Sequence, residues 1–365
     1  MDLPSVERVE ARAYSIPTDG PEQDGTADWD ATTLVIVEVT AGAQSGIGYT
    51  YGPAACASLV GSTLAGVLVG HSVSDTAAAW HEMGAAIRNA GRPGIGMMAL
   101  SAADVALWDL KGRLTGLSVC DLIGAAHEAV PVYGSGGFTN YDVAKLTGQV
   151  AGWVEEGIPR VKIKTSRHPE EDPERLAAVR RAIGEETELF CDANGALGRK
   201  QALYWAQRFA GEWDVRWFEE PVSSEDLAGL RLLRDRGPAG LDIAAGEYGY
   251  LLSQLRDLVA GGCVDCLQAD VTRCGGITAI LRAGALCDAF EVDLSGHCAP
   301  TLSAHALTGV VRLRHLEYFY DHVRIERMAF DGLPRLEGGR LLPDRSVPGL
   351  GLVVKHADLD EHRVA

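Results

Sequence analysis

The sequence predicts an α/β protein in which a closed parallel barrel follows a smaller α+β domain. Two observations lead to this prediction. From about residue 130, eight short apolar segments typical of strands alternate with mostly helical connections. Before residue 125, a few longer strand-like stretches are followed by alanine-rich helical ones. An open, doubly wound sheet is the alternative that the alternation also allows.

Residues 1–125 are expected to form the smaller domain. Its strand-like stretches are 6–17, 32–41 and 45–52, the last being typical of the return strand of a hairpin. Its helical stretches are 54–69, 75–89 and 97–114. Residues 18–31 (TDGPEQDGTADWDA) are polar and contain Gly and Pro, so we expect a loop there that acts as a lid.

Residues 126–325 are expected to form the barrel, and residues 326–365 to return to the smaller domain. The barrel's strand candidates are 131–137, 160–164, 188–194, 215–221, 241–247, 265–270, 291–297 and 315–319. Eight such units with helical connections favour a closed ring over an open sheet.

The composition favours a cytoplasmic protein that acts on small molecules. With 50 acidic and 33 basic residues, the formal charge of −17 repels nucleic acid and anionic membrane surfaces. No apolar run reaches the roughly 18 to 20 residues that span a bilayer, and the first residues resemble no signal or transit peptide. The eight cysteines suit a reduced compartment. Cys263 and Cys266 have zinc-knuckle spacing, but no second pair completes a site, so we interpret them as packing residues.

Charged residues close nearly every strand candidate of the barrel. They are Lys164, Asp192, Glu219, Glu247, Asp270, His297 and Glu317. The carboxyl ends of parallel barrel strands lie together on one face, where the active sites of this architecture are built. The sequence therefore predicts an active site at that face.

Three of these carboxylates, Asp192, Glu219 and Glu247, come from consecutive strands. Ionised carboxylates that converge in a poorly hydrated site repel one another unless a cation holds them. A set of oxygen ligands favours a hard ion, Mg²⁺ before Mn²⁺ or Ca²⁺. Taken singly, each carboxylate is better explained as a loop cap or an arginine partner; together they predict a metal site.

Two lysines on one strand supply the matching positive charge. In Val161-Lys162-Ile163-Lys164 the side chains alternate, so Lys162 and Lys164 share one face. Near a bound cation the pKa of a desolvated lysine falls, which lets its neutral form take a proton near neutral pH. Lysines that protect a solvated edge strand are the structural alternative.

His297 follows a strand, and Asp270 closes the strand before it. A neighbouring carboxylate fixes the imidazole tautomer and raises its pKa, which makes a dyad that gives or takes a proton. A lone histidine at a strand end is more often a packed polar residue, and Asp270 is what shifts the interpretation toward catalysis.

In this order, the motifs resemble those of the enolase superfamily, in particular its mandelate racemase-like subgroup, over almost the whole chain. They are VKIK (161–164), FCDAN (190–194), WFEEP (217–221), AAGE (244–247), QADVTRCGG (268–276), SGH (295–297) and HLEYF (315–319). The resemblance implies a modified (β/α)7β barrel, an N-terminal α+β capping domain and a homo-oligomer. It also implies abstraction of a proton α to a carboxylate, with an enediolate stabilised by Mg²⁺; the pairing of a Lys or His base with Mg²⁺ is this superfamily's known pattern.

The resemblance also implies roles for residues. Asp192, Glu219 and Glu247 are similar to the metal ligands, with Mn²⁺ as an alternative to Mg²⁺. Lys164 resembles a general base that Lys162 assists, and His297 with Asp270 resembles the second acid/base. Glu317 resembles the group that hydrogen-bonds the substrate carboxylate, and Asn194 lies where a polar residue often approaches substrate.

Two opposed acid/base groups allow two outcomes. If the conjugate acid helps a β-hydroxyl leave, the reaction is dehydration of an acid sugar to a 2-keto-3-deoxy acid, which this subgroup performs most often. If a proton returns to the opposite face, a 2-hydroxy acid is racemised. A cycloisomerase also needs the metal and Lys164 but has less use for the His297–Asp270 dyad. Dehydration is the primary prediction.

The expected lid bears on the substrate. Its acidic residues are Asp19, Glu22, Asp24, Asp28 and Asp30. They would repel a second carboxylate at the far end of a substrate, which favours a polyhydroxy monoacid (an aldonate) over a diacid; a merely solvated acidic loop is the alternative. Trp29 in the lid and Tyr51, with Tyr49, are candidates for contact with sugar hydroxyls, although both tyrosines also suit simple packing.

Overall fold

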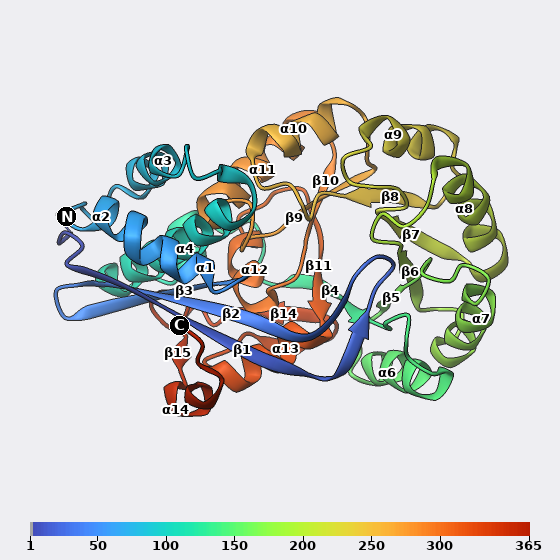
Figure 1. Cartoon of the computed structure of the whole chain (residues 1–365), viewed down its shortest axis with the longest axis horizontal. Helices are drawn as coiled ribbons and strands as arrows, with labels where there is room; N and C mark the ends of the chain where they lie inside the picture. The colour runs from blue at the N-terminus through green and yellow to red at the C-terminus, as the bar shows by residue number, and fades with distance from the viewer. Residues whose placement is uncertain (1–2) are drawn as a thin grey trace.

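The computed structural model describes residues 3–365 and divides into a cap and a barrel (Figure 1). In the cap, a three-stranded antiparallel sheet in the order β1-β2-β3 carries the helices on one side. The strands are β1 (Arg8–Gln23), β2 (Asp28–Ala41) and β3 (Gln44–Tyr51). The helices are α1 (Ala55–Leu59), α2 (Ala65–Leu68), α3 (Thr76–Ala86), α4 (Met97–Thr115) and α5 (Val119–Ile123).

The contact between β3 and α4 is close because β3 carries glycine there. A Cβ at Gly48 would lie 2.1 Å from the carbonyl oxygen of Ala102, and one at Gly46 would lie 2.2 Å from that of Ala106. The cap has its own apolar core, in which Val35, Val37 and Leu100 are fully buried. The sheet is thereby fixed against the longest helix of the cap.

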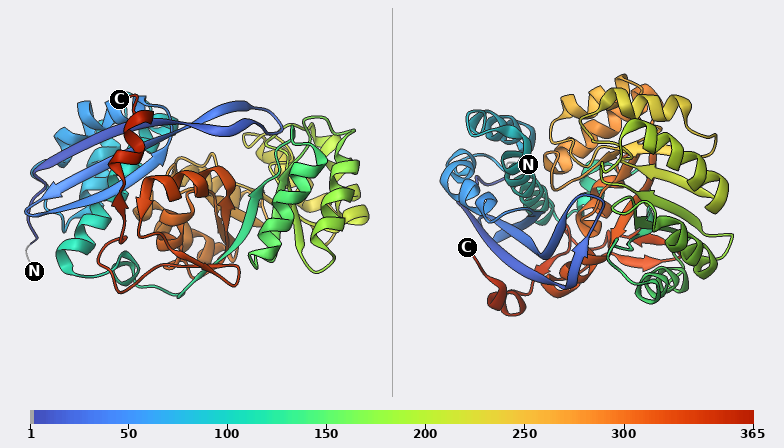
Figure 2. Two further views of the ribbon diagram at one scale, coloured as in Figure 1. Left: turned by 90° about the horizontal axis from the view of Figure 1, so that it is seen from below. Right: turned by 45° about the vertical axis from the view of Figure 1, so that its right-hand side comes forward.

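The prediction of a loop at residues 18–31 is wrong, because most of these residues belong to β1 and β2. β1 and β2 stay paired as far as Gln23 and Asp28, and only residues 24–27 form the turn. The polar, Gly- and Pro-containing composition belongs to an irregularity in the ribbon: residues 18–21 bulge out between the Pro17–Ala31 and Glu22–Trp29 pairs. The resulting ribbon reaches from the cap to the barrel (Figure 2).

The barrel consists of eight parallel strands, and β11 pairs with β4 to close the ring. The open, doubly wound sheet is thereby excluded. The strands are β4 (Val130–Gly136), β5 (Arg160–Lys164), β6 (Glu188–Asp192), β7 (Val215–Glu219), β8 (Asp242–Ala245), β9 (Cys266–Ala269), β10 (Asp293–Gly296) and β11 (Leu313–Phe319).

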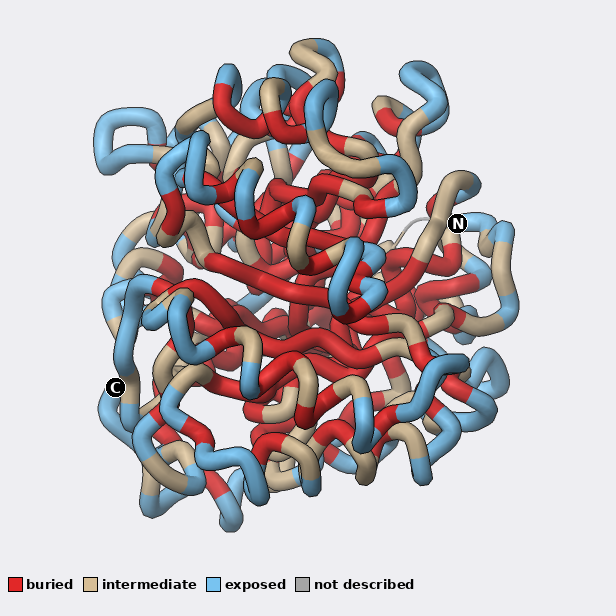
Figure 3. The backbone as a smooth tube through the Cα atoms, turned by 90° about the vertical axis from the view of Figure 1, so that its right-hand side faces the viewer, coloured by how far each residue is buried: buried red, intermediate tan, exposed pale blue. Residues whose placement is uncertain are grey.

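A helix follows each of the first seven strands, so the fold is the expected (β/α)7β barrel with an antiparallel cap. These helices are α6 (Val143–Glu155), α7 (Asp172–Ile183), α8 (Arg199–Trp213), α9 (Leu227–Arg236), α10 (Leu252–Ala260), α11 (Gly276–Phe290) and α12 (Pro300–Leu307). The buried strands form a continuous interior beneath the exposed helix faces (Figure 3).

Aromatic side chains fill the barrel beneath the site. Phe190 stacks on Trp217 with ring centroids 5.5 Å apart, and Tyr133 meets Phe190 edge-on. Cys266 belongs to the same buried cluster, as expected for a packing cysteine. All eight cysteines are buried and carry free thiols. This layer closes the barrel from below, so that polar side chains gather above it.

The C-terminal segment returns to the cap. Helix α13 (Tyr320–Ala329) follows β11, and the short strands and helices beyond it are β12 (Phe330–Asp331), β13 (Arg335–Glu337), β14 (Arg340–Leu342), β15 (Val353–Val354), α14 (His356–Leu359) and η3 (Asp360–His362). At the end of the chain, the carbonyl oxygen of Ala365 accepts a hydrogen bond from the backbone N–H of Ala13 in β1. Among residues 3–365, no helix is long and apolar enough to cross a membrane.

Candidate active site

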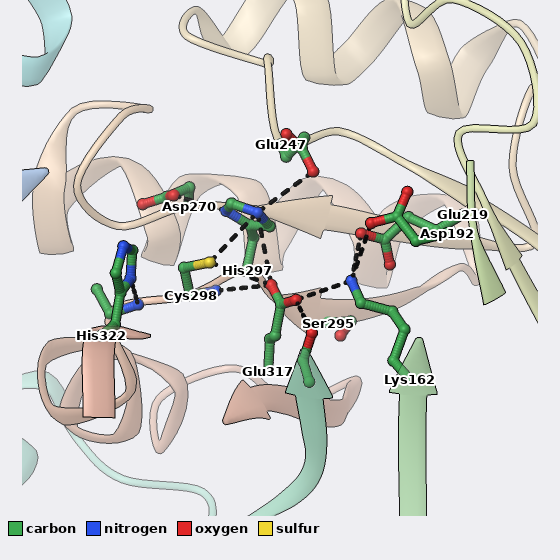
Figure 4. Close-up of polar contacts among 12 residues, drawn as sticks. Lys162, Asp192, Glu219, Glu247, Asp270, Ser295, His297, Cys298, Glu317 and His322 are labelled. Atoms are coloured by element: carbon green, nitrogen blue, oxygen red, sulfur yellow. Dashed lines mark hydrogen bonds and ion pairs between the residues drawn. The ribbon is translucent and has the colours of Figure 1, made fainter. Parts of the chain in front are cut away.

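The polar side chains predicted from the strand ends converge at the carboxyl-terminal face of the barrel (Figure 4). Lys164, Asp192 and Glu219 are the last residues of β5, β6 and β7. Asp270 and His297 each lie one residue beyond a strand, and Glu247 lies two residues beyond β8. All are buried, and so is Glu317 within β11. The strands thus deliver these groups to one enclosed region.

Lys162 is the cation at the centre of this region. Its ammonium lies 2.5 Å from Glu219, 2.8 Å from Glu317 and 3.4 Å from Asp192, and its side chain is completely buried. Burial acts to lower the pKa of Lys162, but the attraction of Glu219 and Glu317 outweighs it and raises the pKa well above its usual value. Lys162 therefore acts as a permanent charge.

The pKa of Lys164 is shifted in the direction opposite to the one expected. Its ammonium donates a 2.6 Å hydrogen bond to Asp192. Burial acts to lower the pKa of Lys164, as expected, but Asp192 outweighs it and raises the pKa instead. The expectation of a lowered pKa presumed that a metal ion already neutralised the carboxylates. Without a bound metal ion, Lys164 itself is the positively charged partner of Asp192.

Asp192, Glu219 and Glu247 fit a divalent cation. One oxygen from each lies within 4.8 Å of the others, all three residues are buried, and Oε2 of Glu247 has no hydrogen-bond partner. Burial and the neighbouring Asp192 raise the pKa of Glu219 to about 8, so the ionised form needs a positive partner. The donors are all oxygens, which suits Mg²⁺ before softer ions. These three residues would hold the metal.

His297 and Asp270 form the expected pair. Asp270 accepts a hydrogen bond from Nδ1 of His297 at 2.7 Å and two more from Thr272, each also 2.7 Å long. Burial lowers the pKa of His297, but the acidic groups around it (Cys298, Glu247 and Glu317, in decreasing order) raise it well above its usual value. Asp270 thus fixes the ring so that Nε2 points into the site.

Glu317 lies between the two sides of the site (Figure 4). Its Oε1 accepts a 2.6 Å hydrogen bond from Ser135 and faces Lys162, while its Oε2 lies 3.5 Å from Nε2 of His297. Lys164 on β5 and His297 after β10 are separated by β4 and β11 around the ring. A substrate held between them is therefore approached from two directions.

The chain directly after His297 is a strained turn that sequence reasoning missed. Cys298 and Ala299 both have left-handed backbone angles, with φ of 49° and 42°. Three side-chain acceptors hold it: Glu317 accepts from the N–H of Cys298, His322 from that of Ala299 and Glu326 from that of Thr301. No spacing in the sequence relates His322 and Glu326 to this turn.

Tyr49 and Tyr51 pack against this support. Tyr51 stacks on His322 with ring centroids 3.4 Å apart, and Tyr49 donates a 2.6 Å hydrogen bond to Glu326. Both tyrosines are buried. Both tyrosines are therefore packing residues, which was the alternative interpretation. Through them the cap contacts His322 and Glu326, the residues that hold the turn after His297.

Asn194 and Trp29 lie differently with respect to the site. Asn194 follows β6 with φ of 45°, and its Oδ1 is buried without a hydrogen-bond partner, as suits a side chain that meets a ligand. Trp29 packs edge-on against Phe138, and its indole N–H donates to Glu22 at 2.8 Å. Its polar atom is therefore already engaged within the hairpin.

The hairpin tip docks on the barrel near the candidate metal ligands. A Cβ on Gly25 would lie 2.2 Å from the carbonyl oxygen of Ala193, which follows Asp192. The hydroxyl of Thr26 donates to the carbonyl of Asn194 at 3.2 Å, and Arg167 pairs with Asp28 at 2.7 Å. The tip thus covers the ends of β5 and β6.

Local partners reduce the negative charge of the hairpin at two of its five acidic residues, Glu22 and Asp28, and engage Asp19 and Asp24 in hydrogen bonds, whereas Asp30 is exposed. Asp28 has Arg167 and Gln23, Asp24 accepts the N–H groups of residues 26 and 27, and Asp19 accepts from Tyr320. Burial, together with the carboxylate of Asp321, raises the pKa of Glu22 to about 8, so Glu22 is mostly neutral at pH 7. The argument for a monoacid is therefore weaker than the composition suggested, and the preference stays a prediction.

Glu22→Gln is expected to remove part of the pH dependence of stability. Folded Glu22 keeps its proton up to pH 8, while the unfolded chain releases it near the ordinary glutamate value of 4.5. Stability therefore rises as the pH falls from 9 toward 5, by at most about 1.4 kcal/mol per pH unit for this group. Urea unfolding at several pH values should show a flatter profile in Glu22→Gln and an unchanged one in a surface control, Glu128→Gln. Equal slopes in all three proteins would contradict the assignment.

Comparison with known proteins agrees with this architecture. Residues 9–124 match the family described as mandelate racemase / muconate lactonizing enzyme, N-terminal domain, and residues 145–358 match the enolase C-terminal domain-like family. A mandelate racemase/muconate lactonizing enzyme-like protein from Rubrobacter xylanophilus has the same fold, with a TM-score of 0.97 and 56% identity over 99% of this chain and 100% of that one.

Two relatives have named activities. The 3,6-anhydro-alpha-L-galactonate cycloisomerase of Streptomyces coelicolor is 32% identical over 96% of this chain and 97% of its own length. The L-talarate/galactarate dehydratase of Salmonella typhimurium, whose structure holds Mg and L-lyxarohydroxamate, is 25% identical with a TM-score of 0.88, over 99% of this chain and 93% of that one.

Proposed function

Because the chain belongs to the mandelate racemase / muconate lactonizing enzyme family of the enolase superfamily, we propose that it removes the proton α to the carboxylate of a sugar acid and eliminates the β-oxygen. The primary candidate reaction is dehydration of an acid sugar to a 2-keto-3-deoxy acid. The observation that carries it is the placement of His297, oriented by Asp270, across the ring from Lys164.

The residues divide the reaction between them. Lys164 takes the α-proton, and the electron pair of the broken C–H bond moves toward the carboxylate. The β C–O bond then breaks as His297 delivers its Nε2 proton to the leaving oxygen. Cys298, Glu247 and Glu317 raise the pKa of His297, which favours the protonated form that a general acid requires. Loss of a hydroxyl as water leaves an enol, which converts to the 2-keto acid.

Positive charge near the substrate carboxylate makes the α-proton removable, because a second negative charge develops there. Lys162 is a permanent source of that charge. Lys162 also lowers the pKa of Glu317, so Glu317 would hydrogen-bond the substrate carboxylate only after taking up a proton. Asp192, Glu219 and Glu247 would hold Mg²⁺, which would offset two of their three negative charges and supply positive charge close to the substrate oxygens. With the charge of Asp192 directed to a bound cation, the attraction that raises the pKa of Lys164 would weaken, which would favour the neutral amine that a base requires.

Ring-opening isomerisation is the second candidate, favoured by the full-length likeness to the 3,6-anhydro-alpha-L-galactonate cycloisomerase. In that substrate the ether oxygen on carbon 3 is β to the carboxylate, so its departure is the same elimination. The leaving oxygen stays attached to the molecule and no water is lost. Such an oxygen also needs a proton, so the His297–Asp270 pair serves both reactions.

A screen of aldonates, aldarates and their anhydro and lactone forms with Mg²⁺ tests the proposal. Dehydration gives a keto acid lighter than the substrate by one water molecule, whereas ring opening gives a keto acid of unchanged mass. Loss of optical rotation with no keto acid indicates racemisation instead. If no compound gives a Mg²⁺-dependent product or exchanges its α-hydrogen with solvent deuterium, the proposal is wrong.

A further inference from the structure

A second group of potential metal ligands lies beside the carboxylates. Nε2 of His297, Sγ of Cys298 and Oε2 of Glu317 lie within 4.8 Å of one another, and all three residues are buried. Sγ is 3.4 Å from Nε2 and 3.2 Å from Oε2, and Nε2 is 3.5 Å from Oε2. Figure 4 shows the three side chains pointing toward a common point. This group is called the N/S/O triad below.

The triad has the dimensions of three corners of a zinc tetrahedron. With zinc bonds of about 2.3 Å to sulfur, 2.05 Å to nitrogen and 2.1 Å to oxygen, tetrahedral angles place the ligand atoms about 3.4 to 3.6 Å apart. The three measured separations of 3.4, 3.2 and 3.5 Å agree to within about 0.4 Å. Little movement is needed to receive the ion.

Each ligand atom is oriented from behind. Nδ1 of His297 donates to Asp270, so the neutral ring presents the lone pair of Nε2, the usual arrangement around a zinc-bound histidine. Ser135 and Lys162 engage Oε1 of Glu317, which leaves Oε2 facing the triad. The left-handed backbone of Cys298 turns its thiol toward the preceding side chain.

We propose that the triad binds Zn²⁺ with a fourth position open, and that zinc inhibits the enzyme. Nitrogen and thiolate donors select zinc over Mg²⁺, whereas the three carboxylates favour Mg²⁺. A bound zinc ion occupies the Nε2 lone pair and one oxygen of Glu317, so neither reaches the substrate. The inhibitory effect rests on the proposed function, but the metal site itself does not.

Zinc binding requires two protons to leave, one from the protonated imidazole and one from the thiol. Burial and Glu317 raise the pKa of Cys298 to about 12 in the metal-free protein, and a coordinated cation reverses this by stabilising the thiolate directly. Glu247, at 3.3 Å from Nε2, is a further negative neighbour of the ion only in protein without Mg²⁺, so in Mg²⁺-loaded protein Glu317 and the thiolate supply the negative charge. The site is therefore electrostatically suited to a dication.

Cobalt tests the site without reference to activity, because Co²⁺ replaces Zn²⁺ and a thiolate bound to it gives a near-ultraviolet charge-transfer band. Protein saturated with Mg²⁺ is titrated with Co²⁺ and then with Zn²⁺. We expect the band in the wild type, its loss in Cys298→Ser, and its displacement by zinc. Absence of the band in the folded wild type would overturn the proposal.

A matched control is available elsewhere in the chain. Cys120 lies 3.6 Å from Nδ1 of His305, both are buried, and neither belongs to the triad. Cys120→Ala is expected to keep the cobalt band. Loss of the band in Cys120→Ala, together with its survival in Cys298→Ser, would assign thiolate binding to that pair and refute the triad.

A second variant covers a failure of Cys298→Ser to fold. Glu317→Gln retains the thiol and the imidazole, so it should keep a cobalt band but bind zinc at least about tenfold more weakly, on the scale that loss of a supporting group at a zinc site produces. Unchanged zinc affinity in Glu317→Gln would contradict the triad.

Once a substrate is found, micromolar zinc should lower Mg²⁺-dependent turnover, and a zinc-selective chelator should restore it. Zinc binding without any turnover would leave the site intact and refute only the proposed function.

Discussion

Replacing His297 with asparagine is expected to lower kcat for sugar-acid elimination by about 10²–10⁴-fold, the usual contribution of a positioned acid or base. Nε2 of His297 carries the proton that the leaving oxygen receives, and asparagine has no acid of similar strength. Lys164, on the other side of the barrel, is untouched. Removal of the α-proton should therefore continue while elimination stops.

The exchange of the α-hydrogen with solvent deuterium separates these two steps. In the His297→Asn protein, NMR should show exchange of one stereoisomer without formation of keto acid. His305→Asn provides a matched control, since His305 is also buried, on α12, but contacts Cys120 rather than the site. It should retain turnover. Full activity in His297→Asn would remove this residue from the mechanism.

The parallel barrel was predictable because its strands are buried on both faces and appear in the sequence as short apolar runs. Polar residues interrupt that pattern mainly where strands end, so the strand-end groups could be identified one by one. Several predicted strands were longer than the observed ones: 241–247 exceeds Asp242–Ala245 by one residue at its start and two at its end, whereas 160–164 coincides with β5. Both estimates place Glu247 at the same face, because β-strand ends and their first loop residues share it. The homo-oligomer expected from the resemblance stays a prediction.

What the sequence did not show depends on partners that are distant along the chain. Residues 18–31 were predicted to be a loop because a solvent-exposed two-stranded ribbon with a bulge is as polar and as rich in Gly and Pro as a loop. The acidity of that ribbon is reduced by the pairing of Asp28 with Arg167 and by the burial of Glu22, and both partners are distant along the chain. The position of Cys298 follows from a left-handed backbone that L-residues seldom adopt, and no residue type marks it in advance.

Lys162→Met is expected to cost about 3–5 kcal/mol of stability in the metal-free protein, as happens when one member of a buried ion pair is removed. Methionine nearly matches the shape of lysine, so little cavity forms. The loss comes from Glu219 and Glu317, which lie 2.5 and 2.8 Å from the Lys162 ammonium and remain buried without it. Urea unfolding without divalent ions measures this effect.

Mg²⁺ should restore more stability to Lys162→Met than to the wild type, because the ion replaces part of the missing positive charge and binds only the folded state. Lys355→Met is the control: its ammonium is partly exposed, 3.4 Å from Asp331 at the surface, where a pair contributes about 0–1 kcal/mol. Equal losses in the two variants, or a loss in Lys162→Met that Mg²⁺ leaves unchanged, would mean that the carboxylates do not depend on a central cation. A larger loss in Lys162→Met, reduced by Mg²⁺, would show that the positive charge of Lys162 stabilises the buried carboxylates in the metal-free protein.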